Sequence, residues 1–155
     1  MGDLLAYDST RPELIPATAP VILYYADGRY KWSGEQLARF PDARVRAITV
    51  EGDPVCDIID VEHGDCTPGD VPNFLRARLD MGVATGTVYC NRSALATVQL
   101  MAGSLPFNLW LATLDGSKPN AVTGPGRLVA VQYAGGEDAE YDTSIVWDRS
   151  WPRRR

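Results

Sequence analysis

The sequence predicts an α/β fold in which about eight short strands form a largely parallel sheet and about three helices pack outside it. In the first two thirds of the chain, β-branched apolar runs alternate with amphipathic segments, which is typical of strand–helix–strand units. In the last third, apolar runs are separated by Gly- and Pro-rich loops without helical periodicity. Because a complete eightfold β/α barrel takes ~250 residues and this chain has 155, a barrel built from it must lack several outer helices.

The first half of the chain supplies four predicted strands and one short helix. Ser33 and Gln36 form a capping-box pattern, so we expect a helix that begins there and stops at Pro41. Only residues 51–56 separate the third strand from the fourth, whereas parallel neighbours normally need a crossover of about a dozen residues. The return is therefore nearly extended, or the pair is not a standard parallel unit. The expected strands are 4–7, 21–25, 45–50 and the start of 57–65.

The second half supplies two helices and four further strands. Thr67 and Pro68 mark a helix start with proline at the first helical position. Asn91 or Ser93 caps the next helix. The apolar face expected on the first of these helices consists of Val71, Phe74, Leu75 and Leu79. The expected strands are 85–90, 108–114, 128–133 and 142–147. With no linker or internal repeat visible, we predict a single domain over residues 1–155.

Composition and charge exclude several classes of partner. A net charge of -5 and a pI near 4.8 argue against a nucleic-acid-binding surface. The only basic cluster, Arg153–Arg155, is interpreted as a solvated terminus. No stretch approaches the ~20 apolar residues of a membrane span, so no membrane partner is expected. No signal peptide is recognisable near Met1, and we expect synthesis in the cytoplasm.

The cysteine and histidine pattern predicts neither a disulfide framework nor a metal site. Cys56, Cys66 and Cys90 are odd in number and irregularly spaced. The chain has one histidine, His63, and no CxxC motif, so a zinc site is not expected. No sequence feature calls for a cofactor.

Residues 57–65 carry the strongest chemical signal. Ile58, Ile59 and Val61 predict a buried strand. Asp60 and Glu62 lie two residues apart on it, so both carboxylates point to the same face. Two acids on one face repel each other, which is expected to raise one pKa and leave the other low. That separation suits a general acid beside a charged stabiliser; the alternative is a strand end whose acids simply meet solvent.

Five short motifs, in order along the chain and at the ends of predicted strands, resemble a known family. They are Tyr7-Asp8-Ser9, Ile59-Asp60-Val61-Glu62, Val88-Tyr89-Cys90, Leu109-Trp110-Leu111-Ala112, and Val131-Gln132-Tyr133 with Tyr141-Asp142. Together they resemble glycoside hydrolase family 25, the lysozyme-type muramidases. They look still more like the short glycoside-hydrolase-like domains of actinobacteria and their phages. The excess of arginine over lysine fits such a GC-rich source.

The resemblance implies a reduced TIM-like β/α barrel, in which five parallel β/α units are closed by further strands. Its site would lie at the carboxyl ends of the strands. The implied substrate is the β-1,4 linkage between N-acetylmuramic acid and N-acetylglucosamine in peptidoglycan, so the expected partner is cell-wall glycan. The implied catalytic residues are Glu62 as general acid, Asp60 as charge stabiliser or acetamido-orienting group, and Asp8 and Asp142 as completing acids. The implied substrate-binding residues are Tyr89, Trp110, Gln132 and Tyr133.

The chain also departs from the family pattern. Ala130 and Val131 stand where the family has a tryptophan before Gln-Tyr, and the third unit has no recognisable helix. The aromatic residues are equally typical of core positions in short strands. The sequence therefore leaves two functions open: a muramidase, or a non-catalytic barrel that serves as a glycan-binding or phage virion structural module beside other virion proteins.

Overall fold

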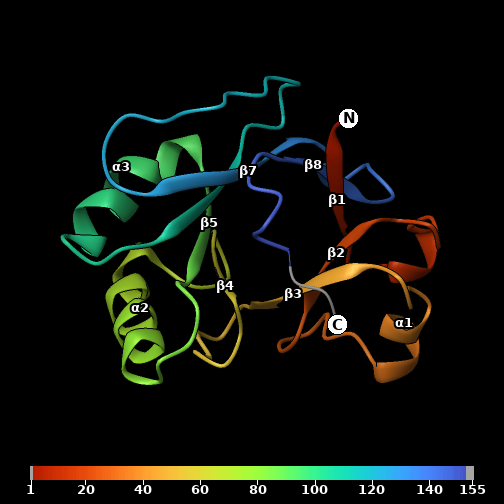
Figure 1. Cartoon of the computed structure of the whole chain (residues 1–155), viewed down its shortest axis with the longest axis horizontal. Helices are drawn as coiled ribbons and strands as arrows, with labels where there is room; N and C mark the ends of the chain where they lie inside the picture. Colours follow the sequence, from red (N-terminus) through yellow and green to blue (C-terminus); the bar gives the residue numbers. More distant parts are fainter. Residues whose placement is uncertain (1, 153–155) are drawn as a thin grey trace.

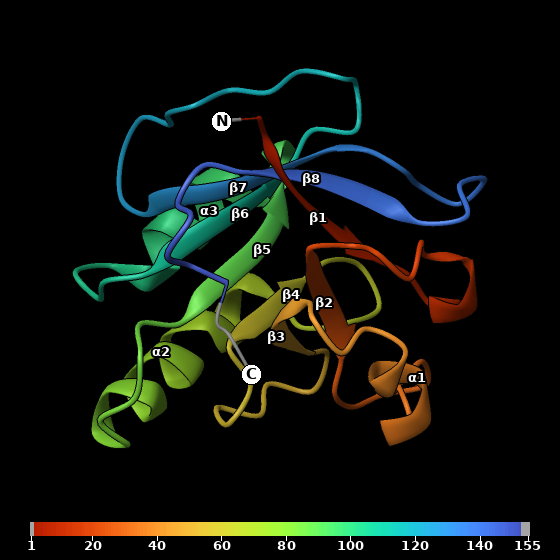
Figure 2. The same ribbon diagram turned by 45° about the vertical axis from the view of Figure 1, so that its right-hand side comes forward.

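The computed structural model describes residues 2–152, in which eight strands form a closed barrel in chain order (Figures 1 and 2). The basic cluster Arg153–Arg155 lies outside the described residues. Neighbouring strands from β1 to β7 are parallel, and β8 runs antiparallel to both β7 and β1 and so closes the barrel. The strands are β1 Leu4–Asp8, β2 Val21–Tyr25, β3 Arg44–Thr49, β4 Ile58–Val61, β5 Thr87–Asn91, β6 Asn108–Ala112, β7 Arg127–Ala134 and β8 Asp142–Val146.

The expectation of about eight strands in a barrel with few outer helices is confirmed at this level. Helix α1, Gly34–Ala38, follows β2; α2, Val71–Asp80, follows β4; and α3, Arg92–Ala102, follows β5. Short 3-10 helices occupy Pro12–Leu14 and Pro68–Asp70. Figure 2 shows α2 and α3 on one side of the barrel and α1 on the other. No α-helix within residues 2–152 is long and apolar enough to cross a membrane.

The β3–β4 connection, left open by the sequence, is a parallel pair joined by a helix-free return. Ile48 and Thr49 pair with Ile58 and Ile59 in parallel register. Because no helix covers this return, side chains from elsewhere must satisfy its backbone groups. The guanidinium of Arg78, from α2, donates to the carbonyls of Pro54 and Cys56.

The predicted helix caps are confirmed at Ser33 and Asn91, but the predicted start of α2 and its predicted buried face each need a correction. Ser33 Oγ accepts from the Gln36 amide at 3.1 Å and the Gln36 side chain accepts from the Ser33 amide at 2.8 Å, as the capping box predicts. Asn91, rather than Ser93, caps α3. The helix start predicted at Pro68 is a 3-10 turn that precedes α2. Leu79, expected on the buried face, is 47% exposed, and Arg78 is buried instead because it serves the neighbouring loop carbonyls.

The barrel interior is filled in layers. Apolar side chains from alternate positions form its middle: Ala6, Leu23, Ile48, Ile58, Trp110, Ala130 and Val146. Trp151 closes the end at which the parallel strands begin, where its indole N–H donates to Thr87 Oγ1 at 2.8 Å and its carbonyl accepts from Arg46 Nε at 2.6 Å. The other end of the barrel is left for polar side chains.

Candidate functional site

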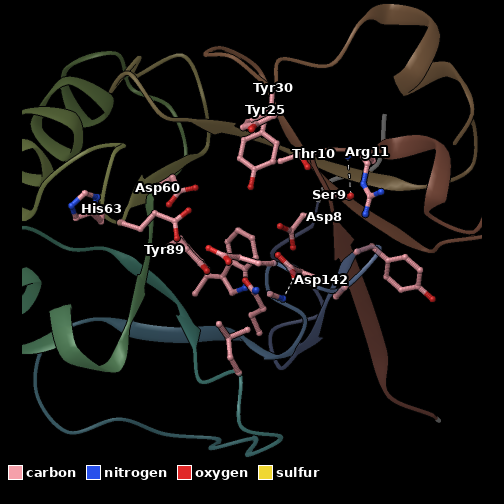
Figure 3. A pocket seen from close by; sticks show the side chains of 18 residues that line it. Asp8, Ser9, Thr10, Arg11, Tyr25, Tyr30, Asp60, His63, Tyr89 and Asp142 are labelled. Atoms are coloured by element: carbon pink, nitrogen blue, oxygen red, sulfur yellow. Dashed lines mark hydrogen bonds between the residues drawn. The ribbon is translucent and has the colours of Figure 1, made fainter.

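A cavity of about 680 Å³ opens where the parallel strands end (Figure 3). It contains seven of the eight site residues named from the sequence. They are the acids Asp8, Asp60, Glu62 and Asp142, with Tyr89, Trp110 and Gln132. The expectation that the four acids converge at one end of a barrel is therefore met by the geometry.

Strand register explains this convergence. Asp8, the last residue of β1, lies directly opposite Asp142, the first residue of β8. Asp60 pairs with Tyr89 across β4 and β5, and Tyr89 pairs with Trp110 across β5 and β6. Because side chains alternate along a strand, residues in register on neighbouring strands share a face. Here that face is the barrel interior at its carboxyl end.

Three carboxyl groups from the acidic stretch form one hydrogen-bonded chain. Asp60 bonds to Glu62, and Glu62 bonds to Asp65. An oxygen from each lies within 4.8 Å of the other two. Carboxylates only accept hydrogen bonds, so each such contact requires a shared proton. Asp65 was not part of the motif. It is the last residue of the stretch 57–65, three residues after Glu62, and this position could have indicated that it belongs to the same acidic cluster.

The depth of the two motif acids differs from the expected division of roles. Asp60 is 3% exposed, while Glu62 stands exposed at the cavity mouth. Burial, followed by repulsion from Glu62, raises the pKa of Asp60 well above its ordinary value. Partial loss of solvent around its carboxyl group, followed by the neighbouring Asp65, also raises the pKa of Glu62. Both values rise, instead of one rising and one staying low, because the strand carries Asp60 below the rim.

Asp8 and Asp142 form a second carboxyl pair, on the side of the cavity opposite Asp60 (Figure 3). Burial, then repulsion from Asp142, raises the pKa of Asp8 well above its ordinary value. Burial also raises the pKa of Asp142, but hydrogen bonds from the Gly136 amide at 2.8 Å, from Asp8 and from Gln132 oppose that rise. The shared proton therefore sits on Asp8, and Asp142 is the acceptor of the pair.

Aromatic rings form the floor and walls of the cavity. The rings of Tyr89 and Trp110 lie 4.5 Å apart between centroids, and the Trp110 indole donates to Ser144 Oγ at 2.9 Å. Both residues are buried, so they belong to the barrel core and the cavity floor at once. Tyr141, from the last motif, also lines the cavity, although no role was assigned to it, and the motifs did not name the lining residues Tyr25 and Tyr30. Tyr25 ends a predicted strand, which was the available signal.

Tyr133 does not line this cavity, contrary to the expectation of a sugar-stacking residue there. Its ring lies 4.2 Å from Lys118 Nζ instead. Gln132 occupies the cavity-facing position of β7, and adjacent residues on a strand point to opposite faces. The strand period alone therefore separates these two neighbours.

An oxygen-only donor set of Asp60, Glu62 and Asp65 is what a hard cation such as Ca²⁺ or Mg²⁺ prefers. These residues would hold one if the protein used a metal. Hydrogen bonds also link Asp60 to Glu62 and Glu62 to Asp65. The absence of a metal site stays a prediction.

Comparisons of the chain with protein-family models, with curated proteins and with solved structures found no match. The family resemblance therefore rests on the five motifs, their order and their chemistry. The fold and the cavity supply the physical argument for function.

Proposed function

We propose that the protein is a glycoside-hydrolase-like enzyme of the muramidase type, acting on the glycan strands of peptidoglycan. The observation that carries this proposal is the convergence of four acids over an aromatic floor at the carboxyl ends of the parallel strands. We further propose that the barrel is a reduced TIM-like β/α barrel related to glycoside hydrolase family 25. The unbroken parallel order from β1 to β7 supports this, as does the position of the cavity.

Glu62 is the proposed general acid. Glycoside hydrolysis needs a carboxylic acid that still holds its proton at working pH and can reach the leaving oxygen. Partial loss of solvent around its carboxyl group and the neighbouring Asp65 raise the pKa of Glu62, and the exposed side chain at the cavity mouth can reach a bound glycan. No other acid of the cavity combines these two properties with a place in the Asp-x-Glu motif.

The deeper acids hold and stabilise the sugar. Asp60 is buried at the cavity floor and has one carboxyl oxygen without a hydrogen-bond partner, so it is suited to accept a hydrogen bond that orients the sugar substituent. Asp142 accepts hydrogen bonds from Gly136, Asp8 and Gln132, which fix its carboxylate in place. A fixed negative charge beside the ring stabilises the positive charge that develops in an oxocarbenium-like transition state.

The aromatic residues suit a carbohydrate ligand. Sugar rings carry apolar C–H faces that pack on aromatic rings, and phenol hydroxyls at the edge can hydrogen-bond to sugar hydroxyls. Tyr89 and Trp110 provide the ring faces at the floor. Tyr25 and Tyr30 stand at the wall (Figure 3). This combination of acids and aromatics supports a glycan over a nucleotide or a lipid.

Replacing Glu62 by glutamine tests the proposal. Glutamine keeps the shape of the side chain but cannot deliver a proton, and general acid catalysis contributes about 10²–10⁴-fold. We expect wild-type protein to lower the turbidity of actinobacterial cell-wall suspensions, and Glu62→Gln to lose that activity by a factor in this range. Glu35→Gln, an exposed acid on α1, is the matched control and should retain activity.

A negative result assigns the other function. If wild-type protein clears no wall suspension from about pH 4 to pH 8, and Glu62→Gln melts at a higher temperature than wild type, the enzyme proposal fails. Relief of carboxylate repulsion would then be the only effect of the substitution. The protein would be a non-catalytic barrel, with glycan-binding or phage virion structural roles as the remaining alternatives.

A further inference from the structure

The floor of the cavity carries a surplus of hydrogen-bond acceptors. Within residues 2–152, three buried side-chain atoms have no hydrogen-bond partner: Asp8 Oδ1, Asp60 Oδ1 and Gln132 Oε1. All three residues line the same cavity and are at most 3% exposed. Buried polar atoms are nearly always paired, so three unpaired atoms in one cavity indicate a ligand that supplies donors.

The orientation of the Gln132 amide follows from its neighbour. The Gln132 side chain bonds to Asp142, whose carboxylate also accepts from the Gly136 amide. A carboxylate acceptor requires a donor, so the amide nitrogen of Gln132 faces Asp142. Its oxygen is therefore the atom left free, and it stands as an acceptor independent of the acidic residues.

No positive side chain in the described part of the chain compensates the buried acids. The ion pairs there involve Asp57, Asp115 and Asp148, and neither Asp8 nor Asp60 has such a partner. Arg11 lines the cavity but is itself exposed. The Asp8–Asp142 pair shares one proton and so keeps one negative charge at the cavity floor. A poorly solvated charge without a cation is costly, so a ligand that brings both donors and positive charge would be favoured over a neutral one.

We propose that the cavity floor binds the protonated amino group of a 2-amino-2-deoxy sugar, so that the preferred glycan carries free amino groups in place of some acetamido groups. An ammonium offers three donors and no acceptor, which matches the three unpaired oxygens of Asp8, Asp60 and Gln132. An acetamido group offers one N–H donor and adds a carbonyl acceptor to a site that already has too many. This inference rests on the proposed function and specifies its substrate class.

Calorimetric titration of the Glu62→Gln protein tests the inference, because that variant leaves the glycan uncut. The two probes are β-1,4-linked tetramers of glucosamine and of N-acetylglucosamine, titrated at about pH 6, where the amine is protonated. Hydrogen bonds to a charged group are stronger than neutral ones, so we expect the glucosamine tetramer to bind at least about tenfold more tightly. Equal affinity, tighter binding of the acetylated tetramer, or binding of neither would overturn the inference.

Two further variants separate the cavity from general attraction of a polycation to an acidic protein. Adding Asp8→Asn should weaken binding of the glucosamine tetramer by about tenfold. Adding Glu35→Gln makes the same change from a carboxyl group to an amide on the exposed side of α1 and should have little effect. Equal losses in both would overturn the inference. If Asp8→Asn does not fold, the comparison of the two tetramers decides alone. Failure of the proposed function is recognised separately, by walls that wild-type protein does not clear.

Discussion

Arg78 should be a main support of the β3–β4 return on which the acidic strand depends. Its side chain is 3% exposed, and its guanidinium donates to the Ala84 carbonyl at 3.0 and 2.8 Å and to the Pro54 carbonyl at 2.9 Å. It also lies 3.5 Å from Asp57, which has a second cation at 2.7 Å in Arg46. The Arg78→Met substitution keeps the aliphatic stem and removes every one of these polar contacts.

The expected loss can be worked from these contacts. Removing one partner of a buried charged network costs about 3–5 kcal/mol. Asp57 keeps Arg46, so we take the lower limit, about 3 kcal/mol in the free energy of unfolding. For a chain of this size each kcal/mol shifts the melting temperature by about 2–4 °C, which gives a decrease of roughly 6–12 °C.

Urea unfolding followed by tryptophan fluorescence measures the loss. Arg76→Met, two residues earlier on the exposed side of the same helix, is the matched control and should stay within about 0.5 kcal/mol of wild type. A loss below about 1 kcal/mol for Arg78→Met, or an equal loss for the two variants, would refute the assignment of Arg78 as the support of this return.

Two other substitutions probe the acids themselves. Burial raises the folded-state pKa of Asp60 above its unfolded value, so the folded protein binds the Asp60 proton more tightly than the unfolded chain does. The stability that this proton provides is complete below about pH 4 and is lost as pH rises through the folded-state pKa. Asp60→Asn should therefore gain stability relative to wild type as pH increases from about 4, and a difference in unfolding free energy that does not change with pH would contradict this. Gly135 has φ +131, and a Cβ there would overlap Asp142 Oδ1, so Gly135→Ala should destabilise the protein and reduce wall clearing. Gly136→Ala, with φ +113 and open space around its Cβ, shares the backbone strain without the overlap, and equal effects of the two would show that displacement of Asp142 does not matter.

Several features of this protein were determined by local sequence. The Ser33–Gln36 capping box and the Asn91 cap involve residues three positions apart or fewer, so no distant contact is needed to form them. The placement of Asp8 at the end of β1 and of Asp60 near the end of β4 follows in the same way from the short apolar runs that precede these acids. The period of a strand even gives the outward direction of Tyr133 once Gln132 is known to face inward.

Other features depended on contacts between distant segments. The sequence did not specify that β8 would run antiparallel between β7 and β1, and that choice alone places Asp142 opposite Asp8. Strand period likewise puts Asp60 and Glu62 on one face but says nothing of depth, because depth depends on how far neighbouring strands rise around each residue. The burial of Arg78 in place of Leu79 has a similar cause. The carbonyls of the β3–β4 return lie beside α2 only in the folded barrel, where Arg78 donates hydrogen bonds to them. Satisfying these buried carbonyls outweighs the burial of one apolar side chain.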